Sequence, residues 1–145
     1  MGKKLIAYTD GSYNSTTGRY GCGAVLIDDK EQEITRMHKT GKPDSGANGW
    51  NINGEIEAAI MAMHTAIELG CDELVIYHDY EGVGKWPDGI WKAKKSYTQA
   101  YATEVRKMRE QIDITFIHVK GHHGNRWNEI ADQEAGIGAN QFGSK

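Results

Sequence analysis

The first forty residues alternate short apolar segments with clusters of Asp, Gly and Asn. Residues 4–9, 21–28 and 32–39 are apolar or alternate between apolar and polar positions, and turn-forming residues separate them. This pattern is typical of short strands that are joined as hairpins. We therefore expect the chain to begin with three antiparallel strands.

Helical periodicity replaces this pattern after a Gly-, Asp- and Asn-rich stretch at residues 41–54. Between Glu55 and Leu69, apolar side chains recur at helical spacing, at Ile56, Ile60, Met63 and Ile67. Gly70 follows and supplies a stop signal. The pattern predicts an amphipathic helix over residues 55–69.

A further strand is expected at residues 73–78, whose sequence is Glu-Leu-Val-Ile-Tyr-His. Two strands joined through a helix normally form a right-handed crossover, so this strand should lie parallel to the one at residues 4–9. Asp10 and Asp79 directly follow the two strands. The parallel pairing therefore predicts that Asp10 and Asp79 lie close together.

The second half of the chain predicts two more helices and one more strand. An irregular segment at residues 80–96 precedes a helix whose apolar face is formed by Tyr97, Tyr101, Val105 and Met108. A strand is expected at residues 113–119 and a helix near residues 128–137. The element order indicates an α/β fold with a mixed five-stranded sheet, three antiparallel strands then parallel strands, flanked by helices. We expect one domain over residues 1–138 and a flexible tail at 139–145.

Composition places the chain among globular proteins. Of its 145 residues, 39% are hydrophobic and 26% are charged, and no apolar run approaches the roughly 20 residues of a membrane span. The N-terminal apolar stretch is too short for a signal-peptide core, so we expect a cytoplasmic protein that does not contact the membrane. Cys22 and Cys71 lie far apart, and we expect both to be buried free thiols with no structural zinc.

The charge is unevenly distributed along the chain. A formal net charge of -3 argues against indiscriminate nucleic-acid binding. Residues 85–107 nevertheless carry a local excess of positive charge, with Lys85, Lys92, Lys94, Lys95, Arg106 and Lys107 against Asp88 and Glu104. Taken alone, this stretch is typical of a solvated helical face.

Four acidic residues stand at the boundaries of predicted elements: Asp10, Glu55, Asp79 and Asp132. Each alone fits a turn, a cap or an ordinary surface acid. Together they bring carboxylates from two strand ends and two helices, which is the donor set that Mg²⁺ requires. Two such ions, roughly 3.5–4 Å apart, support an in-line displacement at phosphorus. The sequence therefore predicts a metal-dependent phosphoryl-transfer site.

A glycine-flanked histidine, His122, precedes the last predicted helix in Val119-Lys120-Gly121-His122-His123-Gly124. Because histidine titrates near neutral pH, this residue suits proton delivery to a leaving 3′ oxygen or assistance with metal release. The adjacent His123 also permits a transition-metal interpretation. No Cys or third His stands at ligand spacing, so zinc is disfavoured.

Five short motifs occur in a fixed order along nearly the whole chain. They are Tyr-Thr-Asp-Gly-Ser at 8–12, Asn-Gly-Glu-Ile-Glu-Ala at 53–58, Tyr-His-Asp-Tyr at 77–80, Val-Lys-Gly-His at 119–122 and Asn-Glu-Ile-Ala-Asp at 128–132. In this order and spacing the chain resembles the type 1 ribonucleases H of bacterial type. The resemblance implies a ribonuclease H-like fold and cleavage of the RNA strand of RNA:DNA hybrids, leaving 5′-phosphate and 3′-hydroxyl ends.

The resemblance also implies roles for individual residues. It makes Asp10, Glu55, Asp79 and Asp132 the catalytic carboxylates and ligands of two Mg²⁺ ions, with Mn²⁺ as a substitute. Asp10 would bridge both ions, Asp132 would help hold the ion that activates water, and Glu55 with Asp79 would hold the other. His122, not His123, would be the catalytic-loop histidine.

Substrate contacts implied by the resemblance fall into two groups. RNA-side contacts are expected from the Gly11 amide, Ser12, Asn51 and Asn53. DNA-phosphate and aromatic contacts are expected from Trp86, Trp91, Lys92, Lys94 and Lys95. We expect a monomer whose partner is an RNA:DNA hybrid duplex.

The sequence departs from the family pattern at two places where contacts with the substrate are expected. Ile52 stands where many members place an Asn, and the stretch after Asp79 is shorter than the basic protrusion of some bacterial relatives. We also expect no N-terminal hybrid-binding domain, and hence lower processivity.

Two alternatives remain open. A transposase- or integrase-like strand-transfer enzyme usually carries three acids and lacks the Lys-Gly-His loop. A catalytically inactive hybrid-binding module would have no reason to retain four mutually repelling acids.

Overall fold

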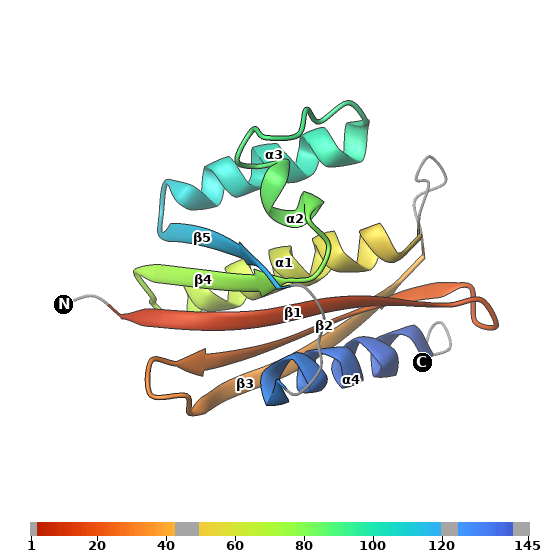
Figure 1. The fold of residues 1–145 in the computed structure, drawn as a ribbon, viewed down its shortest axis with the longest axis horizontal. Helices are drawn as coiled ribbons and strands as arrows, with labels where there is room; N and C mark the ends of the chain where they lie inside the picture. The colour runs from red at the N-terminus through yellow and green to blue at the C-terminus, as the bar shows by residue number, and fades with distance from the viewer. Residues whose placement is uncertain (1–2, 43–49, 120–124, 141–145) are drawn as a thin grey trace.

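The computed structural model describes residues 3–42, 50–119 and 125–140, and Figure 1 shows their arrangement. The elements in chain order are β1 (Lys4–Asn14), β2 (Arg19–Asp28), β3 (Glu33–Gly41), α1 (Trp50–Glu68), β4 (Glu73–His78), α2 (Gly82–Lys85), α3 (Ser96–Arg109), β5 (Asp113–His118) and α4 (Arg126–Asn140). The predicted order of strands and major helices is confirmed.

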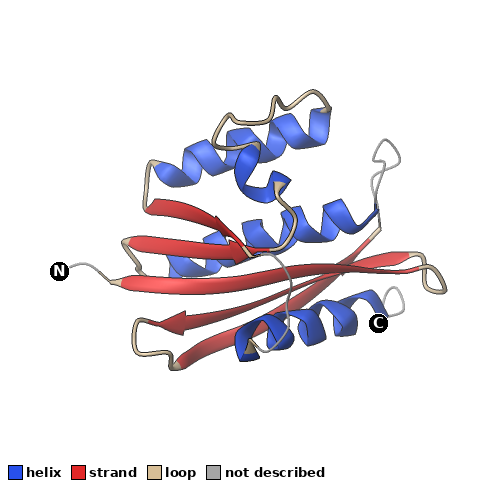
Figure 2. Ribbon diagram, viewed as in Figure 1, coloured by secondary structure: helices blue, strands red, loops and turns tan. Residues whose placement is uncertain are grey.

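The strands form one mixed sheet in the order β3-β2-β1-β4-β5. The β1–β2 and β2–β3 pairs are antiparallel, whereas β1–β4 and β4–β5 are parallel. Helices cover both faces: α1 and α3 lie on one side of the sheet and α4 lies on the other (Figures 1 and 2). The predicted five-stranded sheet flanked by helices is therefore confirmed.

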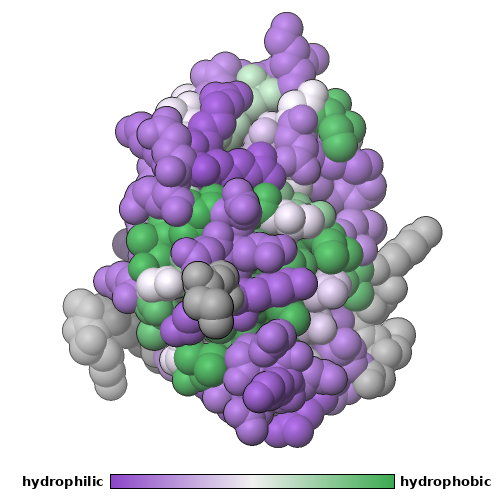
Figure 3. Space-filling model, turned by 90° about the vertical axis from the view of Figure 1, so that its left-hand side faces the viewer, coloured by the Kyte–Doolittle hydropathy of each residue, from purple (hydrophilic) through white to green (hydrophobic). Residues whose placement is uncertain are grey.

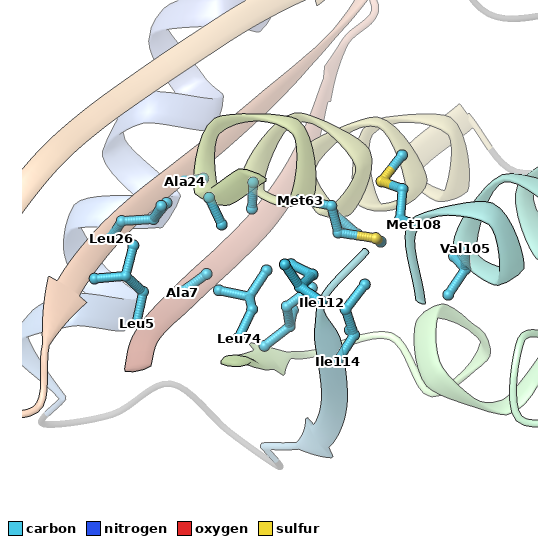
Figure 4. Close-up of a cluster of buried hydrophobic side chains, with 14 of the residues drawn as sticks. Leu5, Ala7, Ala24, Leu26, Met63, Leu74, Val105, Met108, Ile112 and Ile114 are labelled. Atoms are coloured by element: carbon cyan, nitrogen blue, oxygen red, sulfur yellow. The ribbon is translucent and has the colours of Figure 1, made fainter. Parts of the chain in front are cut away.

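Strand β2 is buried on both faces because helices cover both sides of it. Ala24 and Leu26 belong to the larger core cluster, between the sheet and α1. Figure 4 shows their side chains among those of β1, β4, β5, α1 and α3. Val25 and Ile27 point to the opposite face, where they pack against Trp127 and Ile130 of α4. A near-continuous apolar strand is what two-sided burial requires.

Helix α4 approaches β2 closely through glycines. A Cβ on Gly21 would lie 2.0 Å from the Ala135 carbonyl oxygen, and one on Gly23 would lie 2.4 Å from that of Ala131. Both distances are too short for any side chain. The Gly-x-Gly alternation at the start of β2 therefore lets the backbone of α4 rest on the sheet.

Several element boundaries differ from those predicted, three of them by three residues or more. Strand β1 continues past Asp10 to Asn14, because the hairpin with β2 stays paired as far as Asn14 and Arg19. Helix α1 begins at Trp50 instead of Glu55. Helix α4 runs to Asn140, past the expected domain boundary at residue 138. Of the expected tail, residues 141–145 lie outside the described part of the chain.

The surface at the beginning of β1 is predominantly hydrophilic, and its apolar areas are separated by polar residues (Figure 3). Within the described ranges, no helix combines the length and apolar character that crossing a bilayer requires. Cys22 and Cys71 are free and buried, as expected.

Candidate active site

The register of the parallel pair β1–β4 brings two acidic residues to one edge of the sheet. Tyr8 pairs with Tyr77, and Asp10 and Asp79 each follow two residues later. The Thr9 hydroxyl donates a hydrogen bond to the Tyr77 carbonyl over 3.3 Å, which holds the strands together at this point. The predicted proximity of Asp10 and Asp79 is confirmed by the positions of their carboxylates, described below.

A buried histidine shapes the turn after β4. His78 is 3% exposed, and its Nδ1 lies 2.9 Å from the Tyr80 carbonyl oxygen. Because a carbonyl only accepts, Nδ1 carries the proton in this contact. Burial lowers the pKa of His78. The neutral ring therefore braces the turn that presents Asp79.

Glu55 reaches the same edge from α1, in the second turn of the helix and not in the first as predicted. The preceding residue explains its placement. A Cβ on Gly54 would lie 2.7 Å from the Gly21 carbonyl oxygen and 3.0 Å from Gly11 Cα. The absence of a side chain at Gly54 lets α1 contact β1 and β2, so that Glu55, only 5% exposed, is buried beside Asp10.

Asp10, Glu55 and Asp79 form one compact cluster. Each offers a carboxylate oxygen, and the three oxygens lie within 4.8 Å of one another. The Gly11 backbone N–H donates to Asp10 Oδ1 at 2.8 Å and to Glu55 Oε2 at 3.1 Å. Glu55 Oε1 is buried and accepts no hydrogen bond from the described residues. The cluster is thus rich in negative charge, and one of its buried oxygens, Glu55 Oε1, lacks a donor among the described residues.

This environment raises the pKa of Glu55 well above its ordinary value. Burial is the largest cause, followed by the charge of Asp10 and by a hydrogen bond between the two carboxyl groups, while the Gly11 N–H opposes the shift. Without a cation, the cluster therefore favours a proton on Glu55.

The donor set fits a divalent metal ion of the oxygen-binding kind. Three carboxylates from separate elements converge, and one buried oxygen, Glu55 Oε1, lacks a donor among the described residues. Mg²⁺ and Mn²⁺ take such ligands, whereas zinc and copper sites are rich in imidazole or thiolate.

Comparison with known proteins agrees with this geometry. The RNase H family model matches residues 2–140. The chain belongs to the ribonuclease H family. Members of this family are hydrolytic nucleases, so the acidic cluster lies in an enzyme fold.

Relatives cover nearly the whole chain. The ribonuclease H of Francisella philomiragia is 32% identical, over 90% of this chain and 88% of the relative. That of Alcanivorax borkumensis is 31% identical, over 99% of this chain and 96% of the relative.

Solved structures show the same fold. RNase H1 from the archaeon Halobacterium salinarum has a TM-score of 0.78 at 23% identity, over 93% of this chain and 96% of that one. LC11-RNase H1, solved in complex with an RNA/DNA hybrid, has a TM-score of 0.73 at 20% identity, over 92% of this chain and 97% of that one.

Two further residues, Asp132 and His122, were predicted to be catalytic. Asp132 lies on α4 with an exposed side chain, outside the group of three whose ligand atoms lie within 4.8 Å. His122 lies outside the described residues, as does the side chain of Asn51. Their catalytic and binding roles in this ribonuclease H stay predictions.

Two predicted RNA-side contacts lie beside the acidic cluster. Ser12 is half-buried in β1, where it pairs with Gly21. Asn53 lies two residues before Glu55, and its Oδ1 is buried without a donor among the described residues. It lines a pocket of about 420 Å³ together with Tyr20 and Tyr97.

The predicted DNA-side contacts divide into two kinds. Lys92, Lys94 and Lys95 stand in the segment that precedes α3, and all three are exposed. Trp86 and Trp91 form an aromatic cluster with ring centroids 5.7 Å apart. Trp86 also packs against the main core, so it has a structural role that its sequence position did not reveal.

A second pocket, of about 610 Å³, adjoins these tryptophans. It is lined by Trp86, Gly89, Trp91, Lys92, Ala93, Gln99, Ala102, Thr103 and Arg106. Arg106 comes from α3, outside the segment predicted to bind DNA. Its positive charge was noted in the sequence, but only the fold brings it beside Trp91 and Lys92.

Proposed function

We propose that this ribonuclease H hydrolyses the RNA strand of RNA:DNA hybrids at the cluster of Asp10, Glu55 and Asp79. The observation that carries the proposal is the convergence of these three carboxylates within 4.8 Å, with Glu55 Oε1 buried and lacking a donor among the described residues. Family membership supports the reaction type, and LC11-RNase H1, which has the same fold, binds an RNA/DNA hybrid.

The residues that would hold metal are Asp10, Glu55 and Asp79, with Asp132 as a further ligand from α4. When bound, two Mg²⁺ ions, or Mn²⁺ in their place, would supply activation of a water and stabilisation of the departing 3′ oxygen, leaving 5′-phosphate and 3′-hydroxyl ends.

The protein groups contribute orientation and charge. The Gly11 N–H holds the Asp10 and Glu55 carboxylates in fixed orientations. Burial of Glu55 keeps water away from one side of the cluster, which strengthens its electrostatic interactions. His122 would deliver a proton to the leaving 3′ oxygen, since a histidine titrates near neutral pH.

Recognition of the hybrid would involve two surfaces. Ser12, the Gly11 amide, Asn51 and Asn53 would contact the RNA strand, where the 2′-hydroxyl distinguishes RNA from DNA. Lys92, Lys94 and Lys95 would bind DNA phosphates beside Trp91, with Trp86 supporting the aromatic surface from the core.

A cleavage assay tests the proposal. Labelled RNA:DNA hybrid, DNA duplex and RNA duplex are each incubated with wild type, Asp10→Asn and Asp113→Asn in Mg²⁺. Asp113 is an exposed acid at the start of β5 and serves as the matched control. We expect cleavage of the hybrid RNA strand only, a reduction of at least about 100-fold in Asp10→Asn, and wild-type activity in Asp113→Asn.

Three outcomes would contradict the assignment. Equal cleavage by wild type and Asp10→Asn would place the chemistry elsewhere. Cleavage or joining of DNA duplex in preference to the hybrid would favour the strand-transfer alternative. Absence of any cleavage with Mg²⁺ or Mn²⁺ would favour an inactive binding module.

A further inference from the structure

The segment between α2 and α3 folds back against α3 (Figure 1). The Lys85 carbonyl accepts hydrogen bonds from the backbone N–H groups of Ile90 and Trp91, at 2.9 Å and 3.0 Å, which closes a turn after α2. The Gln99 side-chain amide of α3 donates to the Ala93 carbonyl over 3.2 Å. The second pocket, of about 610 Å³, is lined by both segments, so a hydrogen bond joins its two walls.

The second pocket carries positive charge. Lys92 lines it from the segment before α3 and Arg106 lines it from α3, and none of its described lining residues is Asp or Glu. Neither cation forms an ion pair with another described residue. The acids of the same region, Glu81 and Asp88, pair with other basic side chains. Two unpaired cations at one hollow attract an anionic group.

The pocket of about 420 Å³ lies against the opposite face of α3. It is lined by Tyr97 and Glu104 of α3 and by Glu57 of α1, and its described lining residues include no Lys or Arg. Gln99 and Arg106, which line the second pocket, stand on the other side of the helix, because successive residues are about 100° apart. The difference in charge across α3 therefore directs an anion to the second pocket.

Two indole rings form one wall of the second pocket. Trp86 and Trp91 both line it, with ring centroids 5.7 Å apart and planes inclined by 74°. The Tyr80 ring packs beside both, with centroid distances of 5.7 Å and 6.0 Å. Aromatic side chains bind nucleic-acid bases by stacking, without preference for one base. In a duplex each base already stacks on its neighbours, so this wall suits a base that is unpaired.

We propose that the second pocket binds one unpaired nucleotide, with its base against Trp91 and its phosphate between Lys92 and Arg106. The pocket volume lies within the range of about 300–1,000 Å³ that encloses small ligands. The ligand chemistry is that of a nucleoside monophosphate, which a single-stranded stretch of DNA and a free nucleotide both supply. The inference goes beyond the proposed function, in which the lysines of this segment bind phosphates of paired DNA, and it does not depend on metal at the acidic cluster.

Binding of single-stranded DNA in EDTA tests the site without cleavage or metal. The probes are labelled hexathymidylate and an abasic chain of the same length, which keeps the phosphates and lacks the bases. We expect the wild type to bind hexathymidylate about tenfold more tightly by fluorescence anisotropy, because a base stacks in the pocket. Trp91→Leu should bind the two probes equally. Equal binding of the two probes by the wild type would overturn the proposal.

Two adjacent cations on α3 provide a matched pair of variants that leave the indole wall intact. Arg106 lines the pocket, whereas Lys107 is exposed and does not line it. Arg106→Gln should weaken hexathymidylate binding at least about threefold and reduce the slope of log K against log salt concentration by about 0.7, the value for one phosphate of a single strand. Lys107→Gln should leave both quantities unchanged. Equal losses in the two variants would show that general positive charge binds the strand, and would overturn the proposal.

A titration with thymidine 5′-monophosphate distinguishes the two sources of the ligand. It is followed through the indole N–H resonances of isotope-labelled protein, with inorganic phosphate as the comparison. We expect the nucleotide to shift the resonances of Trp86 and Trp91, to leave that of Trp127 on α4 unchanged, and to produce larger shifts than phosphate. Tighter binding of hexathymidylate identifies a single strand as the ligand, whereas equal affinities identify the free nucleotide. No shift at Trp86 or Trp91 with either nucleotide probe would overturn the proposal.

These measurements are separable from the cleavage assay. A protein that binds single strands in this pocket and cleaves no hybrid would contradict the proposed function alone. A protein that cleaves hybrids and binds neither hexathymidylate nor the free nucleotide in this pocket would contradict the present proposal alone.

Discussion

Asp10 and Glu55 accept hydrogen bonds from one and the same backbone N–H, that of Gly11. A single neutral donor shared by two carboxylates does not compensate their mutual repulsion, and Asp79 adds a third acid nearby. The cluster therefore lowers the stability of the folded protein as long as neither a proton nor a cation is bound to it. Such a conflict between stability and activity is typical of functional sites.

Glu55→Gln should stabilise the metal-free protein at neutral pH by about 0.5–2 kcal/mol. The pKa of Glu55 is raised in the folded protein, mainly by burial and next by Asp10. The stability that this group contributes is therefore complete below its unfolded pKa and is lost as pH rises through the raised folded value. Urea unfolding of both proteins in EDTA, from pH 4 to pH 8, measures the difference.

The advantage of Glu55→Gln should shrink toward pH 4, where protonation of the wild-type carboxyl removes its repulsion with Asp10. Glu68→Gln, at an exposed position of the same helix, should show no such pH-dependent gain. A pH-independent difference between wild type and Glu55→Gln would mean that packing, and not ionisation, causes it.

Mg²⁺ or Mn²⁺ should stabilise the wild-type protein, and chelation should reverse the effect. A ligand that binds only the folded state adds about 2.7 kcal/mol when its free concentration is 100 times its Kd. Asp79→Asn should abolish most of this gain, because it removes one of three ligands. Thermal unfolding at increasing metal concentration measures it, with Asp113→Asn as the unaffected control. Equal metal-induced shifts in wild type and Asp79→Asn would exclude this cluster as the binding site.

Gly54→Ala should destabilise the protein by about 1–3 kcal/mol and reduce hybrid cleavage. The added methyl would lie 2.7 Å from the Gly21 carbonyl oxygen and would push α1, with Glu55, away from the sheet. Gly136→Ala is the matched control, since the new methyl at this helical position meets nothing within 4 Å. It should gain about 0.5–1 kcal/mol. Similar effects of the two substitutions on denaturant midpoints would contradict close packing at Gly54.

Replacing Lys92, Lys94 and Lys95 with Gln together should weaken hybrid binding and flatten its salt dependence. All three stand exposed in the segment before α3, and Lys92 also lines the second pocket together with Arg106. The slope of log K against log salt concentration should fall by up to about one for each phosphate that the variant no longer neutralises. Lys30→Gln, at the exposed turn between β2 and β3, is the control. An unchanged slope in the triple variant would exclude this segment from DNA binding.

Sequence patterns were sufficient for the sheet and for most of the acidic cluster. Strand periodicity and the handedness of the crossover predicted that Asp10 and Asp79 adjoin, and the register of β1 with β4 explains why they do. The start of α1 was not predictable in this way. Residues 50–54 contain Asn and Gly, which are poor helix formers, and the close contact of Gly54 with β1 and β2 outweighs that preference.

The direction in which side chains point was the property that the sequence predicted least well. Asp132 and Glu55 both lie on helices within family-like motifs, yet Asp132 is exposed whereas Glu55 is only 5% exposed. The motif spacing carries no information about how a helix is rotated against the sheet. Trp86 shows the same limit, because its position among lysines predicted a contact with nucleic acid but did not reveal that its side chain also packs against the core.

The cluster of Asp10, Glu55 and Asp79 takes one residue from a strand, one from a helix and one from the turn after the strand that follows the crossover. During synthesis on the ribosome, the first two emerge well before the third. A nascent chain that has not yet placed β4 beside β1 therefore has no complete cluster. Under the proposed function, a nascent chain can therefore hydrolyse RNA only after β4 has paired with β1.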